Sequence, residues 1–301
     1  MQQWARWIMH AKHRQILLLA SLMLLPGLQV VSIGIAVASV IATGATQALT
    51  VLVPGFGIVI IANLFSPENS FAAIAPLVLI CFSALVLGEV LRRTASLTLT
   101  IQAVALIASL VVAGMHLGIT DIVGFWATML QQGIEAYVSQ GIIRPLSGPE
   151  MNSIVEGIAP IATGMVVGSM ALFLVLALLL GYFLWDHGCD DAKARFGRFR
   201  DLNLGRTLAV VLIVMALLML TGSLVWTNMA IVLLVVFGLH GLALVHWAKN
   251  KFGLPILFMW IFYAAVIVVK ELSLLVCVAG YVDAWFNFLR GDGSNQRPEA
   301  G

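Results

Sequence analysis

Charged side chains are scarce in this chain, because Asp, Glu, Lys and Arg make up 10% of its 301 residues. None occurs between Ile16 and Leu64, and elsewhere the charges stand in short clusters between long apolar runs. So few polar side chains cannot cover the surface of a soluble protein of this size. The chain must therefore use lipid as its solvent, and several of its apolar runs reach the roughly 20 residues that a membrane-spanning helix needs.

The apolar runs favour helices over a β-barrel. Only helices and closed barrels satisfy every backbone polar group inside a bilayer. Barrel strands alternate apolar and polar residues, whereas Met165–Leu184 and Leu208–Leu220 are apolar on all faces. We therefore predict an all-α polytopic transmembrane helical bundle of about eight spans. It should form a single integral membrane domain over residues 1–290, followed by a disordered tail over residues 291–301.

The uncharged stretch near the N-terminus is the hardest to divide into spans. We take Ile16–Ala42 as one broken span and Gln47–Leu64 as the second, although a short hairpin followed by one span also fits. The last stretch, Leu254–Leu289, is either one span with an interfacial tail or two short spans that meet at Lys270 and Glu271. The other expected spans are Phe71–Leu91, Leu97–Leu117, Ile158–Trp185, Thr207–Leu220 and Val225–Ala248.

The distribution of Lys and Arg predicts the orientation in the membrane. Basic residues gather at the N-terminus and at positions 92–93, 193–206 and 249–251, and such clusters favour the cytoplasmic side. Residues 118–156 carry four acidic residues against one arginine, so this segment should face the other side, where helical spacing of its apolar residues predicts one amphipathic helix. We expect a multi-pass membrane protein with a cytoplasmic N-terminus.

The sequence also lacks the motifs of the common enzymes and cofactor sites. It has no GxxxxGK[ST] loop, HExxH, GxSxG or pair of catalytic carboxylates, so we expect no enzyme and no ATP hydrolysis by this chain. The residues from Asp186 to Asp191 include metal-ligand types, but their spacing matches no standard site. We expect no cofactor and no metal, and the nearly neutral net charge of +2 gives no support for nucleic-acid binding.

Polar residues inside apolar runs are the candidates for a substrate or ion site, because ionisable groups are costly at membrane depth. His240 stands in mid-span between two glycines, where the alternative to a ligand or proton-relay role is a hydrogen bond between helices. Lys270 and Glu271 lie deep if the last stretch is one helix and are solvated if it turns there. Gln102 and Asn63 complete the candidate set as polar groups that could line a cavity.

Two further groups of residues point to the membrane surface. The basic cytoplasmic loop is a candidate site for a protein partner or an anionic lipid, and its relevant residues are Arg195, Arg198, Arg200 and Arg206. Near the C-terminus, Asp283 with Trp285 and Arg290 is typical of an anchor at the membrane interface.

Four passages of the chain carry a family resemblance. They are Trp7–Met9, Phe196–Arg206, Gly238–His246 and Gly280–Phe288. In this order they resemble the YybS-like family of bacterial integral membrane proteins in its proteobacterial form, which is distantly similar to the S-components of energy-coupling-factor transporters. The chain departs from that pattern at His240, where the resemblance predicts Gln.

The resemblance implies a transporter-like protein. It would be a membrane subunit that binds a small molecule of the vitamin type and works with a separate motor subunit, since the chain has no ATPase of its own. The expected partners are then the lipid bilayer, a small-molecule ligand, and motor or scaffold subunits, with no nucleic acid. The alternative is a non-transporting membrane scaffold that recruits protein or lipid partners through its basic loop.

Overall fold

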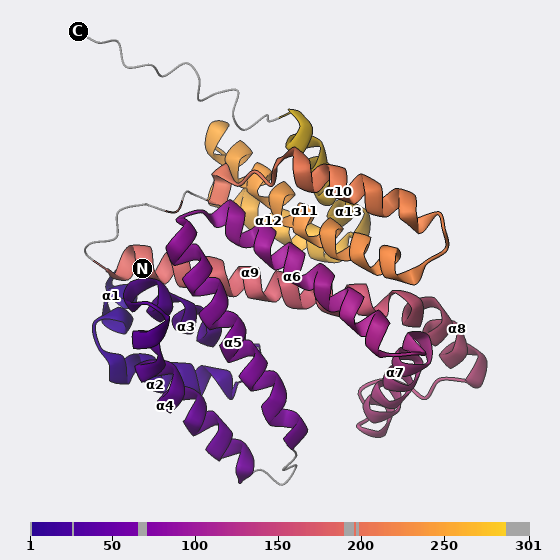
Figure 1. Ribbon diagram of the computed structural model, residues 1–301, viewed down its shortest axis with the longest axis horizontal. Coiled ribbons are helices and arrows are strands. Elements are labelled where there is room, and N and C mark those ends of the chain that lie inside the picture. The colour runs from indigo at the N-terminus through magenta and orange to yellow at the C-terminus, as the bar shows by residue number, and fades with distance from the viewer. Residues whose placement is uncertain (1, 26, 66–70, 190–195, 197–198, 287–301) are drawn as a thin grey trace. The chain divides into compact units, whose positions relative to one another are not determined.

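Helices make up most of the part of the chain that the computed structural model describes, which is residues 2–25, 27–65, 71–189, 196 and 199–286. No strand occurs among these residues, so the predicted all-α class is confirmed. The helices (Figure 1), in chain order, are α1 (Gln2–Met9), α2 (Lys12–Met23), α3 (Gln29–Thr43), α4 (Ala45–Leu64), α5 (Phe71–Thr94), α6 (Leu97–Gly118), α7 (Ile122–Ser139), α8 (Gly148–Ile158), the 3-10 helix η1 (Ala159–Ile161), α9 (Ala162–Gly188), the 3-10 helix η2 (Phe199–Asp201), α10 (Gly205–Met219), α11 (Leu224–Lys251), α12 (Ile256–Val268) and α13 (Lys270–Phe286).

Four helical segments of the described residues are long and apolar enough to cross a membrane: α4, α6, the continuous stretch Gly148–Gly188, and α11. A fifth candidate is the pair of α12 and α13, which is bent by 111° at its break. Because a span needs about 20 apolar residues, helices of this kind are typical of membrane proteins, as the sequence predicts. The count of about eight spans goes beyond this, since α3 and α10 have 15 residues each.

The chain divides into two compact units, with boundaries inside α6, inside α9 and between η2 and α10. The first unit comprises residues 1–104 and 172–202, and the second comprises residues 105–171 and 203–301. The tail over residues 291–301, predicted to be disordered, lies outside the described residues.

In the first unit, α2 and α3 form an antiparallel hairpin. Ser32 Oγ donates a hydrogen bond to the Leu19 carbonyl at 2.7 Å, and further along Ser39 Oγ donates to Gln15 Oε1 at 3.0 Å. The 12 residues of α2 extend about 18 Å at ~1.5 Å per residue, which is too short to cross the hydrocarbon core. In place of the single broken span expected over Ile16–Ala42, the structure has a short hairpin followed by α4, as in the alternative interpretation.

Small residues let the helices of this unit approach closely. A β-carbon on Gly181 of α9 would lie 2.7 Å from the Gly34 carbonyl oxygen of α3, so the two backbones touch there. The chain then passes from α3 to α4 through Gly44, whose φ of +88° lies in the left-handed region that glycine adopts without a steric penalty. Glycine at these positions therefore sets both the packing and the turn.

The second unit is built around α11. A turn at Gly222, with φ of +75°, joins α10 and α11 into a hairpin (Figure 1), and α13 packs against α11. The expected amphipathic helix is present as α7, and a second helix, α8, follows it. A capping box at Ser147 and Glu150 begins α8, because each side chain accepts a hydrogen bond from the other residue's backbone N–H.

The last apolar stretch folds into two short helices. Val269 is extended, with ψ of 100°, so α12 ends at Val268 and α13 begins at Lys270. The break therefore lies beside Lys270 and Glu271, as in the second alternative, and it divides the stretch into helices of 13 and 17 residues.

Candidate functional site

A buried polar pair joins α11 and α13. His240 Nε2 lies 3.0 Å from Asp283 Oδ2, and both side chains are fully buried. Charged groups can be buried in an apolar interior only if they are paired or neutralised. The structure therefore gives His240 a partner, and it shows that Asp283, expected as part of an interfacial anchor, is buried inside its unit.

Glycines bring the two helices close enough for this pair to form. A β-carbon on Gly241 of α11 would collide with the Val276 carbonyl of α13, and one on Gly280 of α13 would collide with the Phe237 carbonyl of α11. Helices in lipid cross most closely where small residues let the backbones touch. Because an aspartate side chain is short, this close crossing places Asp283 within hydrogen-bond distance of the imidazole.

Half of the polar atoms in the pair have no partner. His240 Nδ1 and Asp283 Oδ1 are buried and make no hydrogen bond to any residue that the structure describes. The surroundings are aromatic, since the ring of Phe237 lies 6.5 Å from that of His240 and 5.6 Å from that of Tyr281, between centroids. Buried polar atoms normally have a hydrogen-bond partner. These two atoms therefore call for an explanation other than packing. Chemically, the pair can hold one proton between Nε2 and Oδ2.

His240 stands out in the sequence as a candidate site residue, whereas the sequence does not indicate that Asp283 is its partner. Asp283 is the one acidic residue of α13 after its first turn, and it follows Gly280 by three residues on the helix. An isolated carboxylate one turn from a glycine in an apolar helix was the available signal. It was outweighed by the neighbouring Trp285, which made an interfacial position the simpler interpretation.

Lys270 and Glu271 belong to the same unit as His240 but do not join the pair. Both stand in the first turn of α13 and are exposed. Among the described residues, neither makes a hydrogen bond or an ion pair with His240 or Asp283. Their position next to the break at Val269 explains why two adjacent charges are tolerated there, since neither is packed inside the unit.

Gln102 and Asn63 lie in the first unit. Asn63 Nδ2 donates to the Val59 carbonyl of its own helix at 2.9 Å, a bond that satisfies the amide locally. Gln102 is half-buried on α6. The candidate cavity residues therefore come from two separately packed units.

The arginines of the basic loop are only partly described. Arg195 and Arg198 lie outside the described residues. Arg200 Nε is 3.7 Å from the carboxylate of Asp201. Arg206 Nη2 donates to the Trp285 carbonyl at 3.2 Å, so it helps to hold the end of α13 beside the start of α10.

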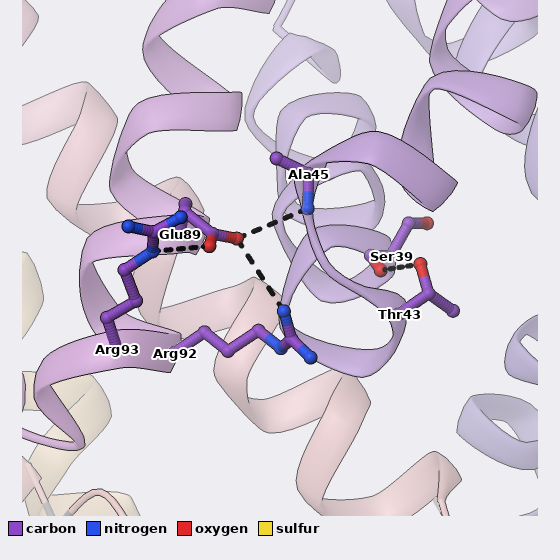
Figure 2. A network of polar contacts seen from close by, with 6 residues as sticks. All are labelled: Ser39, Thr43, Ala45, Glu89, Arg92 and Arg93. Atoms are coloured by element: carbon purple, nitrogen blue, oxygen red, sulfur yellow. Dashed lines mark hydrogen bonds and ion pairs between the residues drawn. The ribbon is translucent and has the colours of Figure 1, made fainter.

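A second polar network lies in the first unit, around Glu89 near the end of α5 (Figure 2). Its carboxylate accepts the backbone N–H of Ala45 at 3.2 Å and pairs with Arg93 at 2.6 Å and Arg92 at 3.9 Å. A carboxylate at the N-terminus of α4 is favourable because the first amides of a helix lack partners. Glu89 thus joins the start of α4 to the end of α5, and the whole network has a structural explanation.

The described residues contain no group of three His, Cys, Asp or Glu side chains that could hold a metal ion. Of the candidate ligand residues from Asp186 to Asp191, the structure describes those up to Cys189. Among them, His187 Nδ1 lies 3.6 Å from Asp186 Oδ2. No family model, curated protein or solved structure matches the chain. The resemblance to the YybS-like family therefore stays a prediction, and the function is argued from the residues themselves.

Proposed function

We propose that this chain is a transporter-like membrane protein whose working element is the His240–Asp283 pair, which binds and releases one proton inside the helix bundle. The observation that carries this proposal is a fully buried, hydrogen-bonded histidine and aspartate on two apolar helices. Ionisable residues at membrane depth are costly, and proton relays in pumps and transporters use such residues. A scaffold that only recruits partners would not require a buried ionisable pair.

The protonation states explain how the pair would act. With one proton shared between His240 and Asp283, the pair is neutral overall, whether that proton resides on nitrogen or on oxygen. Loss of the proton leaves a neutral imidazole beside a buried carboxylate, and an uncompensated buried charge is strongly unfavourable. The deprotonated state therefore favours any arrangement of α11 and α13 that gives Asp283 water or another donor.

The topology that we propose starts from the contacts at the basic end of α5. The Ala45 N–H reaches the Glu89 carboxylate, so α4 begins beside the end of α5, near Arg92. Two crossings before Phe71 would, together with α5, leave Arg14 and Arg92 on opposite sides of the membrane. One crossing by α4 keeps both arginines on the cytoplasmic side, in agreement with the rule for basic residues.

The α2–α3 hairpin fits the same topology. It begins and ends on one side, because Ser39 near the end of α3 contacts Gln15 near the start of α2. Together with α4, α5, α6, α9, α10, α11 and the bent α12–α13 pair, it makes about eight membrane segments. We propose this arrangement for the inner membrane of a bacterium, with the α7–α8 segment on the non-cytoplasmic side.

The resemblance to the YybS-like family is the reason for including a small-molecule substrate in this proposal. The chain would bind the substrate and depend on a separate subunit for any ATP hydrolysis. Native mass spectrometry of the purified protein tests this part, because a retained small molecule or subunit adds a defined mass. The scaffold alternative has less support, since Arg200 and Arg206 already contact protein groups.

Hydrogen exchange of the full-length protein in lipid nanodiscs tests the proton-binding pair. After correction for the intrinsic effect of pH on exchange, peptides from α11 and α13 should exchange faster at high pH in the wild type. His240→Gln and Asp283→Asn should remove this difference, because neither replacement titrates. His246→Gln is the matched control: this histidine of the same helix lies 2.7 Å from the Tyr263 hydroxyl, and its loss should leave the response intact. An unchanged pH response in H240Q and D283N would overturn the proposal.

A further inference from the structure

Between α8 and α9, the helical stretch Gly148–Gly188 tightens into the 3-10 turn η1 at Pro160. Proline has no backbone N–H, and its ring clashes with the carbonyl four residues earlier, so it interrupts a helix. In a continuous α-helix, the N–H of Gly164 would donate to the carbonyl of Pro160. A break of this kind in an apolar segment leaves both groups in need of other partners.

Asn228 of α11 supplies both partners. Its Oδ1 accepts the Gly164 N–H, and its Nδ2 donates to the Pro160 carbonyl at 2.9 Å and to the Leu224 carbonyl of its own helix at 2.8 Å. The side chain is fully buried. The amide therefore occupies the gap in the backbone ladder, and one side chain replaces the missing bond between Pro160 and Gly164.

The sequence of α9 is adapted to this insertion. A β-carbon on Gly164 would lie 2.7 Å from the backbone oxygen of Asn228, closer than atoms pack. One residue earlier, Thr163 Oγ1 accepts the indole N–H of Trp126 at 2.7 Å, and Thr163 is almost fully buried. The break thus also holds α7, which carries Trp126, and both α7 and α8 pack against η1.

We propose that Asn228 is the clasp of a hinge at Pro160, and that its release lets the α7–α8 segment change its angle to α9. Two arrangements of the backbone satisfy these groups. In the clasped one, Asn228 satisfies Gly164 and Pro160. In the released one, Gly164 donates to Pro160 directly, and the Asn228 amide keeps its bond to the Leu224 carbonyl. A ligand or contact that favours one arrangement shifts the population toward it.

This hinge does not depend on the proton-binding role of His240. The same helix α11 carries Asn228 and His240, twelve positions apart, but the hydrogen bonds of Asn228 within the described part of the chain go to α9, η1 and its own helix. The two proposals therefore fail or succeed separately. A variant can therefore alter the hinge while α11 and α13 keep their response to pH.

Distances between two spin labels test the hinge in the full-length protein in nanodiscs. In a background with Cys81, Cys189 and Cys277 replaced by alanine, one label is placed at the exposed Gln132 of α7 and the other at the exposed Thr221 of the α10–α11 turn. Both positions belong to the second unit. Labels at Thr221 and Asn250 bracket α11 and give the reference distance that the hinge should not change.

Asn228→Leu removes the amide while keeping similar size, and it should shift the Gln132–Thr221 distance or add a second population. Pro160→Ala supplies a backbone N–H and removes the ring, so it should favour the released arrangement with its regular helical hydrogen bonds. It should therefore shift the same distance in the same direction as Asn228→Leu. Thr227→Val is the matched control, because the Thr227 hydroxyl bonds only to the Ser223 carbonyl of its own helix at 3.3 Å. It should leave the distance unchanged.

The outcomes are distinguishable even if one variant does not fold. If N228L cannot be purified in a folded form, P160A alone carries the test, since it is expected to relieve the break. Wild-type distances in folded P160A would then overturn the hinge. Where both variants fold, wild-type distances in both, or shifts in opposite directions, would overturn it as well.

Discussion

Gly280 of α13 lies against the backbone carbonyl of Phe237 of α11, with no room for a β-carbon between them. This contact fixes how closely the two helices cross, and the hydrogen bond between His240 and Asp283 depends on that closeness. The crossing is therefore the structural condition for the polar pair, and it can be tested without touching either ionisable residue.

Gly280→Ala should destabilise the protein by about 1–3 kcal/mol, because overpacking a close contact forces the backbones apart. Thermal unfolding in detergent gives the change in Tm. Gly114→Ala in α6 is the control, since a β-carbon there meets nothing within 4 Å. It should be neutral or stabilising by about 0.5–1 kcal/mol, the usual gain of alanine over glycine in a helix. Equal effects of the two substitutions would contradict the tight crossing.

The pair itself predicts a non-additive mutant cycle. Asp283→Leu or His240→Leu alone should cost about 3–5 kcal/mol, because each leaves a buried polar group without its partner. The double variant should recover most of that loss, since replacing both members of a buried pair by apolar residues is often neutral. Unfolding in mixed micelles of denaturing and mild detergent measures the three free energies. Strict additivity would show that the two residues do not interact.

The class of fold was predictable because it rests on apolar length alone. In a charge-free run such as Ile16–Leu64, helices satisfy the backbone hydrogen bonds within the segment. The ends of α6 and α11 coincide with glycine or charged residues in the sequence. The division of that run was not predictable, because the α2–α3 hairpin depends on Ser39 and Gln15 meeting across the turn. Long-range side-chain contacts of this kind leave no periodic signal.

The candidate site was predictable only by half. His240 is visible in the sequence as a polar residue in an apolar span. Its partner lies 43 residues away, and their meeting depends on the angle at which α11 and α13 cross. The clasp by Asn228 was also missed, because nothing local to Asn228 indicates that α9 breaks beside it. Pro160 is visible in the sequence, but the amide that bonds to Pro160 and Gly164 comes from Asn228 on another helix.

The capping box of α8 predicts a local dependence on pH. The backbone N–H of Ser147, and next the guanidinium of Arg144 at 2.7 Å, lower the pKa of Glu150. A carboxyl that is more acidic when folded adds stability above its unfolded pKa, and this stability is lost as the pH falls through the folded pKa. Amides of the first turn of α8 should therefore exchange faster in acid than intrinsic rates predict.

Glu150→Gln should abolish that acid response, because glutamine does not titrate. Glu156→Gln on the same helix serves as the control and should retain it, since none of the described capping contacts involves Glu156. A response to acid that persists in E150Q would assign it to another group.

The protonation of His240 is the most direct test of the central claim. The full-length protein, labelled with ¹⁵N at its six histidines, is placed in nanodiscs, and the His240 ring signals are assigned by their loss in H240Q. Over the pH range in which the protein stays folded, the signals of the His240 ring nitrogens should shift, because loss of the shared proton changes the hydrogen bond at Nε2 wherever that proton resides, and Asp283→Asn should remove the shift. Ring signals that do not shift over this range, or that shift identically in D283N, would contradict the account.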